Sequence, residues 1–114
     1  MQRDEATLLD IANAAHSVQT FIQGLDRVSF LKDYKTQSAV LYQIIVIGEA
    51  VKRLSREFCN QNPEIPWSLI AGMRDHLIHG YDLVDWDEVW KTARSDLPDL
   101  LGKIEPLFPS SESE

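Results

Sequence analysis

The sequence predicts an all-α fold, a bundle of four or five helices, on three observations. Apolar residues recur at alternating spacings of three and four in several long segments, which is the period of one helix face. The chain shows neither the alternation of apolar and polar residues typical of a half-buried strand nor an Asn-Gly type hairpin turn. With 114 residues, of which 44% are apolar and 25% charged, it can bury one core. We therefore expect a single domain over residues 1–108.

The first helix is predicted over about residues 3–23, and Gly24 is suited to end it. A short helical turn at residues 29–31 is expected to pack Phe30 back onto the core. This helix is predicted from an apolar stripe that consists of Leu8, Ile11, Ala15, Val18, Ile22 and Leu25.

The second helix is predicted over about residues 36–59. Its apolar stripe consists of Val40, Ile44, Ile47, Val51, Leu54 and Phe58. A further row, Leu41, Ile45 and Gly48, lies beside this stripe and makes the apolar face wider than one partner helix requires. The extra width predicts a second packing surface, such as the interface of a homodimer.

The third helix is predicted over residues 67–79, with Pro66 in its first turn after a loop at 60–66 and with Gly80 closing it. Asp85 can cap a fourth helix, which Pro98 should kink or restart. The inner face of this last helix is expected to consist of Trp86, Trp90, Ala93, Leu97, Leu100 and Ile104. Residues 109–114 are Pro, Ser and Glu without an apolar anchor, so we expect a disordered C-terminal tail.

The net charge restricts the kinds of binding partner that we expect, and the cysteine content indicates the cellular compartment. The net charge of −7 and the pI near 4.8 argue against broad, charge-driven binding to nucleic acid or an anionic membrane. We expect no DNA partner, and expect any phosphate-bearing partner to be bound by a local basic cluster. Lys52, Arg53 and Arg56 form the clearest candidate, although ordinary solvated charge is the interpretation that we favour for them. Cys59 is the only cysteine, which excludes an internal disulfide and fits the cytoplasm.

No apolar run approaches the roughly 20 residues that a membrane-spanning helix requires. The first residues carry acidic side chains and do not resemble a signal peptide. We therefore expect no membrane association.

The segment from Arg74 to Tyr81 reads Arg-Asp-His-Leu-Ile-His-Gly-Tyr and concentrates the chemistry of the chain. On the predicted helix, Asp75 and His79 are four residues apart and share a face, so the carboxylate can orient the imidazole. Arg74 adds a permanent cation whose donors suit a phosphate oxygen. This combination suits phosphodiester cleavage, whereas a polar helix end with solvated charges is the simpler structural alternative. Tyr81 by itself is equally compatible with an aromatic lid on the bundle.

Other polar residues are assigned structural roles or none. His76 and His79 are three apart, but no further His and no Cys pair lies nearby in the sequence, so we expect neither a metal site nor a cofactor. His76 is treated as a bystander. His16 is expected to be a partly buried structural residue, and Glu49 a buried carboxylate in an ion pair.

Four segments together resemble the HepT-like family of HEPN domains: residues 47–55, 65–67, 70–75 and 79–81. The resemblance extends from the first helix through Leu97 and Pro98. It implies an all-α bundle that forms a homodimer, in which the R-x-x-x-x-H segments of two protomers face one cleft.

The resemblance also implies the toxin component of a type VII toxin–antitoxin pair, a metal-independent endoribonuclease that cleaves RNA. Arg74 and His79 are then the catalytic pair, and Asp75 positions one of them. The implied partner is a minimal nucleotidyltransferase antitoxin of the MntA type, which transfers AMP to Tyr81 and silences the toxin. Two alternatives remain at this point: a non-catalytic HEPN module that docks a nucleotidyltransferase, and a purely structural helical dimer.

Overall fold

The computed structural model describes residues 2–80 and 82–108, and there it contains helices and one isolated β-bridge. The all-α prediction is confirmed. The long elements are α1 (Gln2–Ile22), α3 (Tyr34–Val51) and a C-terminal run in which α7 (Trp86–Lys91) continues through a π-helical turn, η1 (Thr92–Asp96), into α8 (Leu97–Ile104). Within the described ranges, no helix is long and apolar enough to cross a membrane. The predicted disordered tail, 109–114, lies outside these ranges.

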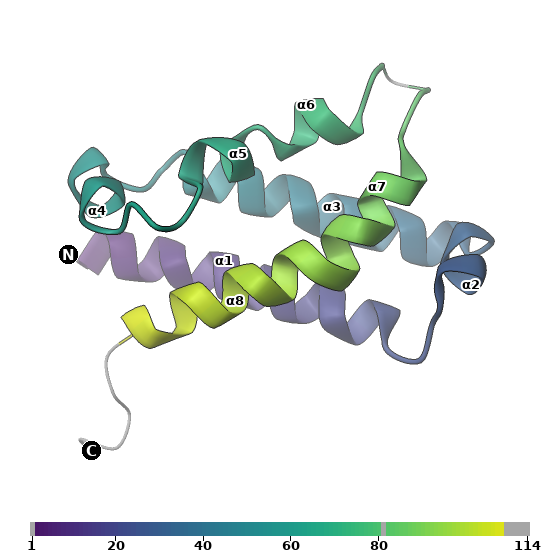
Figure 1. Cartoon of the computed structure of the whole chain (residues 1–114), viewed down its shortest axis with the longest axis horizontal. Coiled ribbons are helices and arrows are strands. Elements are labelled where there is room, and N and C mark those ends of the chain that lie inside the picture. The colour runs from purple at the N-terminus through teal and green to yellow at the C-terminus, as the bar shows by residue number, and fades with distance from the viewer. Residues whose placement is uncertain (1, 81, 109–114) are drawn as a thin grey trace.

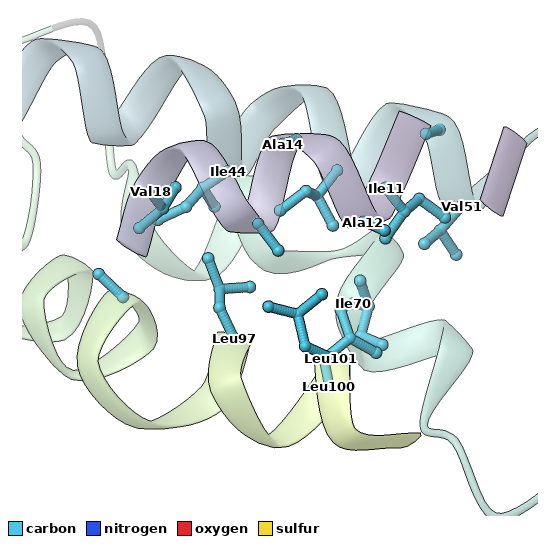
Figure 2. Packing of buried hydrophobic residues seen from close by; sticks show 14 of the residues in the cluster. Ile11, Ala12, Ala14, Val18, Ile44, Val51, Ile70, Leu97, Leu100 and Leu101 are labelled. Carbon is cyan, nitrogen blue, oxygen red and sulfur yellow. The ribbon is translucent and has the colours of Figure 1, made fainter. Parts of the chain in front are cut away.

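The core lies where α1, α3 and α8 meet. Helices α1 and α3 run antiparallel and pack along their length, and α8 lies against α1 (Figure 1). Figure 2 shows apolar side chains of α1, α3 and α8 gathered together with the side chain of Ile70. The side chains with no more than 2% exposure include Ile11, Val18, Phe30, Val40, Ile44, Ile47, Ile65, Leu77, Val89, Leu97 and Ile104. The periodic stripes of the sequence therefore form this core.

The segment that follows α1 agrees closely with the prediction. Gly24 has a φ of 82°, a left-handed conformation that glycine adopts without steric cost, and it lies two positions after the last residue of α1. The short helix α2 (Arg27–Leu31) is capped by Asp26, whose side chain accepts the Ser29 N–H. Phe30 is fully buried and stacks at a tilt on Trp90, with ring centroids 5.2 Å apart. Its predicted return to the core is confirmed.

The prediction that one helix spans residues 36–59 is wrong. Helix α3 starts earlier, after the capping residue Asp33, and ends at Val51. A separate helix, α4 (Arg56–Gln61), begins after Ser55, whose hydroxyl accepts the Phe58 N–H at 3.1 Å. A serine in an extended conformation at this position is a favoured helix start, so the chain turns here while its apolar period continues. Because α4 extends to Gln61, the connecting loop is also shorter than predicted.

Asp4 on α1 holds the start of α4. Its carboxylate accepts the Ser55 backbone N–H at 2.9 Å and the Ser55 hydroxyl at 2.7 Å, although the two residues are 51 positions apart. The hydrogen bond from the Ser55 hydroxyl is the main reason why the pKa of the Asp4 carboxyl lies below its ordinary value. Burial of the nearby Cys59 raises the pKa of its thiol, and Asp4 adds to that shift.

Part of the wide apolar face of α3 is covered within the same chain. Helix α5 (Trp67–Ala71) packs onto α3 at Gly48, where an added Cβ would stand 3.3 Å from the backbone oxygen of Ile70. Leu41 and Ile45, the other members of that row, remain half-buried. The glycine therefore permits a close helix contact, and only the remainder of the face is left for a second chain.

The third predicted helix, 67–79, is also different in the structure. It divides at Gly72 into α5 and α6 (Met73–Leu77), and Pro66 precedes its first residue as the cap position. The helix ends two residues before His79, because Ile78 takes an extended conformation and forms an antiparallel bridge with Val84. Both are β-branched residues that favour extended backbone. Gly80 lies in the following turn, with a φ of 146°.

The C-terminal helix confirms two predictions. Asp85 caps α7 by accepting the Glu88 N–H at 3.2 Å, and Ala93, Leu97, Leu100 and Ile104 are buried as expected. The wider turn η1 lies directly before Pro98, which has no N–H and whose ring would crowd the preceding turn of an α-helix. A 3-10 turn, η2 (Glu105–Leu107), follows α8.

His16 and Glu49 are exposed, so the predicted burial of each is wrong. His16 Nε2 lies 3.1 Å from the Glu105 carboxylate. Glu49 pairs with Lys52 at 3.0 Å, which confirms the ion pair that was expected of it. Both lie on helix faces that point away from the core, beside the apolar stripe.

Candidate active site

The candidate site begins on α6, which Leu77 anchors to the core with 1% exposure. Arg74 lies on the same helix, and its side chain is 56% exposed. Its Nη1 atom stands 3.5 Å from Oδ1 of Asp75, whose side chain is 88% exposed. An exposed ion pair of this kind contributes little to stability, about 0–1 kcal/mol, because water screens it. Asp75 can therefore hold the guanidinium in place and release it to a stronger anion such as a phosphate.

His79 does not lie on α6, so the predicted helical neighbourhood of Asp75 and His79 is wrong. The helix ends at Leu77. The structure instead pairs Asp75 with Arg74, which leaves Asp75 suited to positioning the arginine. The physical reason is the Ile78–Val84 bridge, which commits the backbone to an extended path before His79 is reached.

The bridge fixes the backbone at His79. The His79 N–H donates to the Leu83 oxygen at 2.7 Å, and the Asp85 N–H donates to the Leu77 oxygen at 2.9 Å. The His79 side chain is exposed and follows directly after this hydrogen-bonded base. The backbone of His79 is thus fixed by hydrogen bonds across the base of a short loop, while its imidazole ring remains accessible. Tyr81 lies outside the described residues.

His76 belongs to a different contact. Its Nε2 atom lies 3.7 Å from a carboxylate oxygen of Glu88, which connects α6 to α7. Glu88 could not be recognised from the sequence, because it and His76 lie on different helices and no spacing rule joins them. In the described part of the chain, no group of three or more His, Cys, Asp or Glu residues has an arrangement that could hold a metal.

The candidate basic cluster lies away from Arg74. Lys52, Arg53 and Arg56 are exposed around the junction of α3 and α4, and Lys52 is paired with Glu49. Arg53 lines a small groove of about 370 Å³ between α1 and α3, together with acidic and amide side chains. Figure 1 places α4 at one end of the molecule and α6 further along its length. The structure therefore brings Arg74, Asp75 and the His79 backbone into one region and leaves this cluster outside it.

The fold and the site define an all-α domain that presents an exposed arginine and an exposed histidine from adjoining segments. A family model described as "Ribonuclease HepT-like" matches residues 11–107. The chain belongs to this HepT-like ribonuclease family, which confirms the resemblance inferred from the sequence motifs.

Curated relatives agree. A protein of Thermococcus cleftensis named "Probable ribonuclease HepT" is 45% identical over 100 residues, which are 88% of this chain and 91% of that protein. A Methanocaldococcus jannaschii protein named "Putative RNase" is 37% identical over 109 residues, covering 96% of this chain and 90% of that protein. A protein of Caldanaerobacter subterraneus that is also named "Putative RNase" is 36% identical over 87 residues, which are 76% of this chain and 78% of that protein. No solved structure gives a significant match.

Proposed function

We propose that this chain is a metal-independent endoribonuclease that cleaves RNA through Arg74 and His79. The observation that carries the proposal is their placement: an exposed guanidinium on a helix anchored in the core, and an exposed imidazole on a bridge-anchored loop that directly follows that helix. Family membership and the names of the relatives support the choice of RNA as the substrate.

In the proposed mechanism, the 2′-oxygen of RNA attacks the adjacent phosphorus while His79 accepts its proton. Arg74 stabilises the negative charge that accumulates on the phosphoryl oxygens. The bond from phosphorus to the 5′-oxygen then breaks, and that oxygen takes a proton from the imidazolium of a facing protomer. The products are a 2′,3′-cyclic phosphate and a 5′-hydroxyl. Asp75 acts as a positioning residue for Arg74.

A homodimer completes the site in this proposal. One protomer exposes its Arg74, and the net charge of −7 per chain disfavours RNA, so two facing copies of the motif would concentrate cations in one cleft. The half-buried Leu41 and Ile45 and the exposed Tyr42 on α3 offer an apolar surface for the second copy. Lys52, Arg53 and Arg56 are then candidates for secondary contacts with RNA outside the cleft.

We further propose that the chain is the toxin of a cytoplasmic type VII toxin–antitoxin pair, silenced when an MntA-type nucleotidyltransferase transfers AMP to Tyr81. The residue stands two positions after His79 in the sequence. An adenylyl phosphate there would compete with RNA for Arg74. Mass spectrometry after incubation with the partner and ATP should find AMP on Tyr81, and labelling that persists in Tyr81→Phe contradicts the assignment.

The activity itself is tested with purified protein free of AMP and an end-labelled RNA in the presence of EDTA. Cleavage that yields cyclic phosphate ends is expected, because no step of the mechanism uses a metal. RNA that stays intact, together with tight binding of the nucleotidyltransferase, would favour a non-catalytic docking module instead. Growth arrest on expression, relieved by Arg74→Ala or His79→Ala, tests the toxin role separately.

A further inference from the structure

A groove of about 840 Å³ lies between α5–α6 on one side and α7, η1 and α8 on the other. Its lining includes the buried side chains Ile70, Leu77, Leu97 and Leu100. Leu69 also lines the groove, and it is 74% exposed. Apolar surface that is continuous and open to solvent marks an interaction site.

The groove is long enough to hold a helix of several turns. Its lining on the C-terminal helix runs from Glu88 to Lys103, which corresponds to about 22 Å at the helical rise of 1.5 Å per residue. This length accommodates roughly four turns of a bound helix, whose apolar residues would contact the groove at spacings of three and four. The π-helical turn contributes Thr92 to the lining, and such turns are frequent at functional sites.

The rim is predominantly acidic. The charged side chains that line the groove, apart from His76, are the carboxylates of Asp75, Glu88, Asp96 and Asp99 and the ammonium groups of Lys91 and Lys103. Three of these carboxylates lie near a basic side chain: Asp99 is 3.8 Å from Lys103, Glu88 is 3.7 Å from His76, and Asp75 is 3.5 Å from Arg74. The formal balance of the lining is nevertheless four carboxylates to two ammonium groups. The excess of carboxylates attracts a cationic occupant and repels the phosphates of RNA.

Helices α1 and α3 of a second copy of this chain do not carry the positive charge that such an occupant needs. Helix α1 contains Arg3 against Asp4, Glu5 and Asp10, and α3 contains one lysine and one glutamate. The tail 109–114 is acidic in sequence and would also be repelled. We propose that the groove docks an amphipathic helix of another protein, with apolar residues along one side and lysine or arginine along its flanks.

Arg74 lies outside the docking groove, whereas its partner Asp75 belongs to both the candidate active site and the groove lining. Met73, Asp75 and His76 line the groove, whereas Arg74, which lies between them in the sequence, does not. An occupant therefore leaves the guanidinium accessible while it packs against the helix that carries it. This inference goes beyond ribonuclease activity and does not depend on it.

The test uses the full-length chain and a fluorescent 16-residue peptide designed with leucines at helical spacing and lysines on the flanks. Fluorescence anisotropy should detect binding that weakens as salt is added. Leu69→Ser should weaken it by about tenfold, because a leucine side chain leaves the interface. The matched control is Leu83→Ser, which changes a leucine that is 62% exposed outside the groove and should leave binding unchanged. Because both leucines are exposed, neither variant should unfold.

Two further peptides and two further measurements complete the experiment. Replacing the lysines by glutamates, or scrambling the leucine spacing, should abolish binding. Equal binding by the wild type and Leu69→Ser, or none by the lysine peptide, overturns the proposal. So does an oligomer in sedimentation that Leu69→Ser dissociates and Leu83→Ser does not, because a second copy would then occupy the groove. Competition by a short RNA that depends on Leu69 would overturn it in favour of a nucleic-acid site.

Discussion

Asp4 and Ser55, which are 51 positions apart, are joined by two hydrogen bonds to one carboxylate. The same Ser55 hydroxyl accepts the Phe58 N–H and so starts α4. Asp4 is 3% exposed, so its carboxylate depends on these donors to replace water. A single acidic residue near the N-terminus of α1 thus fixes both the position and the first turn of α4.

Replacing Asp4 with alanine should lower the free energy of unfolding by about 1–3 kcal/mol, because the half-buried Ser55 donors lose their acceptor. Urea denaturation measures the change. The control is Asp10→Ala, an exposed position on the same helix that should stay within about 0.5 kcal/mol of the wild type. If Asp4→Ala and Ser55→Ala had fully additive effects in a double-mutant cycle, the proposed coupling would be absent.

The same carboxylate predicts a pH dependence. Its pKa is lower in the folded chain than in the unfolded chain, so its contribution to stability is complete above the unfolded value of about 3.9. That contribution is lost as the pH falls through the folded pKa. Asp26 and Asp33 also have lowered pKa values from their capping hydrogen bonds, so the measurement must isolate Asp4. The difference in unfolding free energy between the wild type and Asp4→Asn should be constant from pH 7 to about pH 5 and shrink below about pH 4.

Two glycines in helices should respond oppositely to alanine. Gly48→Ala places a methyl group 3.3 Å from the Ile70 oxygen, so α5 must move and stability should fall by about 1–3 kcal/mol. Gly102→Ala, on α8, meets nothing within 4 Å and should raise stability by about 0.5–1 kcal/mol through lower backbone entropy in the unfolded chain. Thermal or urea unfolding of both variants checks the pair, and a stabilising Gly48→Ala would contradict the close packing of α5 on α3.

His79→Ala and Arg74→Ala should each reduce RNA cleavage by a factor of about 100 or more, because one removes proton transfer and the other removes charge stabilisation. Arg74→Lys should recover only part of the activity, since an ammonium group lacks the planar fork. The matched control is His76→Ala, which removes the neighbouring imidazole that contacts Glu88. Equal losses in His76→Ala and His79→Ala would argue that the wrong histidine has been assigned.

Asp75→Asn should lower cleavage by less than Arg74→Ala does, because it removes the partner of the guanidinium and leaves the guanidinium itself. In an Arg74→Ala background the same substitution should have no further effect on the rate. A persistent effect, or a change in the pH profile of cleavage, would return Asp75 to the role of orienting the histidine.

Local signals in the sequence were sufficient for the first and the last helices. Gly24 ends α1, Asp85 caps α7 and Pro98 follows a distorted turn, because caps and breakers act on adjacent backbone. The core residues follow the helical period for the same reason. Family membership also followed from the motifs, since several short ordered segments occur together.

The errors arose where distant residues decide the backbone. The apolar period continues through Ser55, so only the contact from Asp4 and the local cap reveal that α3 and α4 are separate. The sequence likewise has no glycine or proline between Leu77 and Gly80 to stop the helix, although Ile78 pairs with Val84 across the loop. The groove was missed because its two walls come from helices whose relative placement no spacing rule provides.

The Ile78–Val84 bridge after α6 separates local opening of the loop from unfolding of the helical bundle. The amides of His79 and Asp85 are bonded across the base of the loop and are not part of the helical hydrogen bonds of α6. Their exchange with deuterated solvent should therefore report opening of this bridge alone, at a lower free energy than unfolding of the bundle. A substitution in this loop can therefore change how fast the loop opens without altering the core.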